Sequence, residues 1–146
     1  MALNRDFEAL TVNGVCDLSE KNIIAGSPLT LGANGYKLAK AGDAFMGLSF
    51  NYFHTGKNDV TGGEWFADSG KVGVVKIAQV TLEADEIDGV KVSPFQTDGE
   101  FTVGGGVAID ENGVLVPAGS DDESVATVVA FDGQTGKLTL FVNAAK

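Results

Sequence analysis

The same pattern occurs twice in this chain, at residues 23–38 and 101–116. In each copy a glycine precedes a stretch in which apolar residues alternate with others, and an Asn-Gly turn follows. The identical residues in the two copies are Gly26 and Gly104, Asn34 and Asn112, and Gly35 and Gly113. On both sides of each Asn-Gly pair, apolar residues alternate with polar ones, which is the pattern of a β-hairpin. The sequence therefore predicts two similar antiparallel β units.

Each copy continues through an apolar run into a closing strand, which follows a Ser/Thr-Gly-Lys step at 69–71 and at 135–137. Between the copies, alternation over 72–82 predicts one long strand. The 20 glycines lie at turn positions, not at every third residue. We expect an all-β fold, a compact antiparallel β-barrel or sandwich built from two similar hairpin units, with about eight to ten strands.

The first 22 residues are polar at intervals and lack a clear period, so they predict an extended N-terminal arm. Its apolar anchors are Leu3, Phe7 and Leu10, and the arm is expected to pack either on its own barrel or on a neighbouring molecule. Residues 23–146 are predicted to form a single β domain, which is long enough to bury a core without disulfides or metals.

The two copies differ in the connection before the closing strand. In the second copy this connection is a turn at 132–136, whereas in the first it is a long loop at 51–70. Loops of this length in compact proteins are usually functional, although a loop's aromatic residues also form small cores beneath it. The candidate partner-binding residues of this loop are Tyr52, Phe53, Trp65 and Phe66.

The composition argues against several binding partners and cellular locations. Twenty acidic and ten basic residues give a net charge of −10, which opposes binding to nucleic acid and to anionic membranes. No apolar run reaches the roughly 18 residues of a membrane span, and the N-terminus lacks a signal-peptide pattern, so we expect cytoplasmic synthesis. The single cysteine, Cys16, forms no intramolecular disulfide and is expected to be a small buried hydrophobe.

The sequence contains no recognisable catalytic, metal or cofactor motif. His54 is the only histidine and has no nucleophile motif nearby, and one Cys with one His does not make a usual zinc set. Residues 121–123 lack the spacing of a calcium loop, and 104–106 lack the Lys-Ser/Thr of a phosphate loop. We expect no enzymatic activity, no metal and no cofactor.

Three stretches, 25–31, 41–48 and 128–140, resemble the head decoration (cement) proteins of tailed bacteriophages. The resemblance implies a non-enzymatic viral structural protein, often trimeric, that binds the major capsid protein on the outer surface of the virion and stabilises the shell. The candidate contact residues are then Leu3, Phe7, Tyr52, Phe53, Trp65 and Phe66.

Two other classes of function stay open. A carbohydrate-binding or receptor-binding β module would use Phe53, Trp65 and Phe66 as a stacking platform for sugar rings. A small trimeric β enzyme with carboxylate chemistry at a shared site is a third reading, which the lack of a second histidine disfavours.

Overall fold

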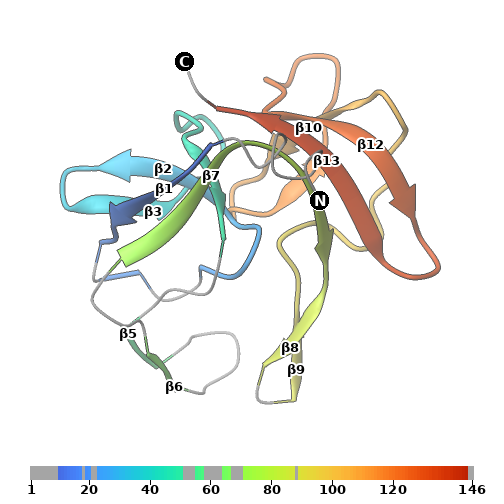
Figure 1. The fold of residues 1–146 in the computed structure, drawn as a ribbon. Coiled ribbons are helices and arrows are strands. Elements are labelled where there is room, and N and C mark those ends of the chain that lie inside the picture. The colour runs from blue at the N-terminus through green and yellow to red at the C-terminus, as the bar shows by residue number, and fades with distance from the viewer. Residues whose placement is uncertain are drawn as a thin grey trace.

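The computed structural model describes residues 10–17, 19–20, 23–50, 55–57, 64–66, 71–87 and 89–144. These residues form strands and turns without a helix (Figure 1), so the prediction of an all-β chain is confirmed. The described strands number 13, above the eight to ten expected, because two short hairpins add to a nine-stranded main sheet.

The first seven strands are β1 (Leu10–Val15), β2 (Pro28–Gly32), β3 (Gly35–Leu38), β4 (Gly47–Ser49), β5 (Thr55–Lys57), β6 (Glu64–Phe66) and β7 (Lys71–Glu83). The others are β8 (Asp85–Ile87), β9 (Val90–Val92), β10 (Gly106–Ile109), β11 (Leu115–Pro117), β12 (Ala126–Asp132) and β13 (Lys137–Asn143). The main sheet has the order β11-β10-β12-β13-β7-β4-β2-β3, and β1 also pairs with β7. Hairpins β5–β6 and β8–β9 form separate two-stranded sheets.

Strand β7 belongs to both units. Val74 and Val75 pair with β1 and also with β4, so β1 and β4 lie on opposite edges of β7. The sheet order places β13 on the edge that β1 uses, and β13 pairs with β7 from Ile77 onward. The first half of β7 therefore closes a first unit of β1 to β4, and its second half opens a second unit of β10 to β13.

The hydrogen bonds repeat from one unit to the other, as the two-unit prediction requires. Gly26 N–H donates to Ser49 O in the first unit, as Gly104 N–H does to Val128 O in the second, both at 2.8 Å. Likewise, Ser27 N–H donates to Ile24 O (3.0 Å), as Gly105 N–H does to Thr102 O (2.9 Å). The turns that follow repeat too, because Asp43 accepts from the Lys40 N–H at 2.9 Å and Asp122 from the Gly119 N–H at 2.7 Å. The two units thus share one backbone design.

The core forms two clusters, and β7 contributes to both, while Leu48 of β4 in the first unit is buried in the second cluster. Val74 is buried in the first cluster, with Ile23 and Leu29, whereas its neighbour Val75 is buried in the second. The second cluster is the larger and includes Leu138, Leu140, Val142, Phe95 and Phe101.

A bulge explains why the alternation of β7 changes face. Leu10 pairs with Ile77 but Thr11 pairs with Val75, so Lys76 is an extra residue in β7. Val75 and Ala78 consequently face the same core although three positions separate them. The regular alternation that the sequence predicted over 72–82 is interrupted here, and the strand curves strongly (Figure 1).

The N-terminal segment is part of the sheet from Leu10 onward. The sequence placed 10–15 within the predicted arm and left open whether the arm packs on its own barrel, and these residues pair with β7 of the same chain. Beyond β1, Cys16 bridges Tyr36 of β3 in parallel, which links the strands of the first unit into a ring.

Candidate functional site

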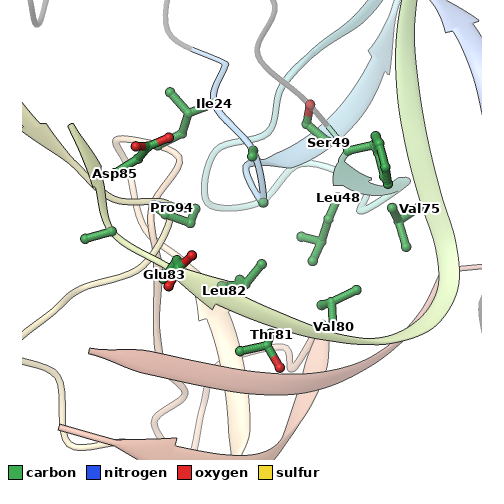
Figure 2. A pocket seen from close by; sticks show the side chains of 14 residues that line it. Ile24, Leu48, Ser49, Val75, Val80, Thr81, Leu82, Glu83, Asp85 and Pro94 are labelled. Atoms are coloured by element: carbon green, nitrogen blue, oxygen red, sulfur yellow. The ribbon is translucent and has the colours of Figure 1, made fainter. Parts of the chain in front are cut away.

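One hollow that the described residues outline is a groove between the two units, with a volume of about 410 Å³ (Figure 2). The first unit contributes the turn at 24–26, the residues 48–50 and Val75. The second unit contributes residues 80–85 and Pro94. The groove therefore exists only because the two units are joined through β7.

The inner part of the groove is apolar. Leu48 from β4 points toward Val80 and Leu82 of β7, and Val75 lies beside them (Figure 2). Thr81, between Val80 and Leu82, points the other way, as alternation along a strand requires, and its hydroxyl lies 3.0 Å from that of Thr139.

One wall of the groove is a strand edge that has no partner strand among the described residues. On the edge of β7 opposite β13, strand β4 pairs only with Val74 and Val75. Within the described part of the chain, no strand pairs with that edge over residues 78–83. The backbone there is arranged to accept an additional strand.

The mouth of the groove combines an exposed aromatic residue with acidic residues. Phe50 is 68% exposed, which is unusual for a phenylalanine next to a buried strand. At the other end lie Glu83 and Asp85, both exposed, and the Asp85 carboxylate accepts the Glu86 N–H at 2.7 Å. The groove thus offers an apolar centre with a negatively charged end.

The groove also lies at the base of both insertions that interrupt the repeat. Phe50 directly precedes the long connection at 51–70, which contains hairpin β5–β6, and Asp85 begins hairpin β8–β9. The second unit replaces the first of these insertions with a turn after Asp132, where Gly136 N–H donates to Asp132 O at 2.8 Å. Both hairpins extend from the same end of the molecule, at the bottom of Figure 1.

Most of the candidate residues from the sequence are not placed by the structure. Leu3, Phe7, Tyr52 and Phe53 lie outside the described residues. Trp65 and Phe66 lie on β6, opposite Gly56 and Thr55 of β5, and their side chains are outside the described part of the structure. Their roles stay predictions. The groove was not predicted from the sequence, in which the one available signal is Phe50, an aromatic residue at the junction between an apolar run and the long connection.

A second, acidic hollow of about 220 Å³ lies where corresponding turns of the two units meet. The acidic residues that line it are Asp43, Asp121, Asp122 and Glu123, and Lys40 joins them. Asp43 and Asp122 already accept backbone N–H groups of their own turns. Among the described residues, no group of three or more potential ligands is placed to hold a metal ion.

Cys16 is buried in the first core, with 1% of its surface exposed. Burial raises the pKa of its thiol to about 12, and the nearby carboxylates of Glu20 and Asp17 raise it further in the same direction. The thiol is therefore protonated at neutral pH, as expected of a packing residue and not of a nucleophile.

Comparison with known proteins found no matching family model, no matching curated protein and no matching solved structure. In the described part of the chain, no helix is long and apolar enough to cross a membrane.

Proposed function

We propose that this chain is a non-enzymatic structural protein that attaches to the outer surface of a bacteriophage capsid, as a trimer, and stabilises the shell. The observation that carries the proposal is the open apolar groove between the units, with exposed Phe50 at its mouth. Exposed large apolar side chains beside a concave apolar surface are typical of docking to another macromolecule. The resemblance of 25–31, 41–48 and 128–140 to decoration proteins supports the capsid as that partner.

Stabilisation follows from linkage. A protein that binds only the assembled lattice stabilises it by its own binding free energy, about 2.7 kcal/mol per site at a free concentration about 100 times its dissociation constant. Over the many equivalent sites of a shell, this term opposes the internal pressure of the packaged genome. The net charge of −10 per chain on the outside would reduce adhesion between particles.

The test uses capsids assembled without this chain, to which the purified protein is added. We expect saturable binding at a fixed ratio to the major capsid protein and greater resistance of the loaded particles to heat and to chelators. Equal resistance with and without the protein, together with saturable binding to a soluble glycan, would overturn the proposal and favour a carbohydrate-binding module.

A further inference from the structure

The internal repeat allows the two units to be compared with each other. A feature present in one unit and absent from the other is not required by the fold that they share. Two insertions depart from the repeat, and hairpins β5–β6 and β8–β9 lie within them. The groove lies beside the start of both insertions, since Phe50 directly precedes the first and Asp85 belongs to the second. The groove therefore adjoins both departures from the repeat.

We propose that this groove is the docking site for one extended segment of the major capsid protein, which adds as a strand to the free edge of β7. This inference rests on the proposed function and names its contact surface. Strand addition uses backbone N–H and C=O groups for affinity and places alternate side chains in pockets. The edge of β7 over 78–83, with which no described strand pairs, supplies the backbone groups. The half-buried Val80 and the exposed Phe50 supply apolar surface beside it for the side chains.

Charge complementarity defines the chemistry of the occupant. Glu83 and Asp85 lie at the end of the groove where β7 leads into β8, and both are exposed. An extended segment with alternating apolar residues and a Lys or Arg at one end fits this arrangement. A second copy of this chain fits it less well, because each copy carries a net charge of −10.

The decisive experiment measures binding of purified variants to capsids that lack this chain. The variant F50S removes the exposed aromatic ring at the mouth of the groove. Its matched control is V129S, because Val129 is the counterpart of Phe50 in the second unit. Ser49 and Val128, which directly precede these two residues, make corresponding backbone hydrogen bonds. Val129 is also exposed, at 38%, and does not line the groove.

We expect F50S to weaken capsid binding about tenfold or more, as truncation of an aromatic anchor does, whereas V129S binds like the wild type. The double variant E83K/D85K should weaken binding and reduce its dependence on salt. The matched control E100K/E111K makes the same change of net charge at two exposed residues outside the groove and should bind normally.

Hydrogen exchange of the wild-type protein supplies a readout that does not depend on any variant. On the capsid, backbone amides within 78–83 should gain protection, because an added strand covers their free edge. Two results would overturn the inference and leave the proposed function intact. One is capsid binding by the wild type without added protection of these amides, and the other is an equal loss of capsid affinity in F50S and V129S. Failure of the wild type to bind capsids would overturn the proposed function. A change of oligomeric state in F50S without loss of capsid binding would identify a second copy as the occupant and also overturn the inference.

Discussion

Gly26 packs directly against Leu82, and this contact joins the turn of the first unit to the groove wall of the second. A Cβ atom on Gly26 would lie 2.7 Å from Leu82 Cδ2 and 3.1 Å from Pro94 Cγ, and the residue has a φ of +88°. Its counterpart Gly104 has nearly the same φ, +82°, but no atom within 4 Å of an added Cβ. The positive φ is thus common to both copies of the repeat. The close contact with Leu82 and Pro94 occurs only at Gly26, where the two units meet.

We predict that Gly26→Ala destabilises the protein more than Gly104→Ala does. Both substitutions force alanine into a left-handed conformation, which costs about 1–2 kcal/mol. Gly26→Ala adds a clash worth about 1–3 kcal/mol, as overpacking does. Urea unfolding of the two variants measures the difference, and equal losses would show that the junction yields to an added methyl group.

The second core should tolerate truncation poorly. Leu140 is fully buried, whereas the next residue, Phe141, points outward and is 38% exposed. Leu140→Ala should therefore lower the free energy of unfolding by about 2–5 kcal/mol, through lost burial and a residual cavity. Phe141→Ala on the same strand should cost less than about 1 kcal/mol. Chemical denaturation compares the two, and a larger loss at Phe141 would contradict the assignment of the faces of β13.

The corresponding turns of the two units should respond alike. Asp43 accepts the Lys40 N–H and Asp122 accepts the Gly119 N–H, both at exposed sites. Replacing either aspartate with alanine should cost about 0.5–1.5 kcal/mol, the value of one such hydrogen bond. Asp43→Asn and Asp122→Asn keep an acceptor oxygen and serve as controls. Thermal unfolding of all four variants tests the equivalence, which fails if only one turn is sensitive to the loss of its acceptor.

The Cys16 thiol should resist alkylation in the native state. Its pKa is raised to about 12 by burial, so almost no thiolate is present at pH 8. We expect iodoacetamide to label Cys16 slowly in the folded protein and rapidly in guanidinium chloride, as mass spectrometry would show. Similar rates in both states would mean that the first core opens readily.

The same shift makes a prediction about pH. Because the thiol pKa is higher in the folded state than its ordinary value of 9.0, its deprotonation favours the unfolded chain. The contribution of this group to stability is fully present below about pH 9 and is lost as the pH rises toward 12. Unfolding free energies measured from pH 8 to pH 10 should fall more steeply for the wild type than for Cys16→Ala. Parallel slopes would contradict a raised pKa.

The sequence by itself determined the β units, because turn chemistry and alternation are local. The Asn-Gly pairs place Gly35 and Gly113 at φ of +120° and +79°, and Asp132 to Gly136 forms the expected turn. The step from two patterns to two structural units also needed no tertiary information, since each hairpin carries its own register.

Only the tertiary structure decided how the units join and where a site lies. The bulge at Lys76 turns one strand from the first core to the second, and this depends on how β1 pairs with residues more than 50 positions away. The groove needs Leu48 and Leu82 to meet across that junction, and their sequence positions alone do not bring them together. Non-local pairing, which is invisible to periodicity, therefore fixed the unpaired edge of β7 and the surface beside it.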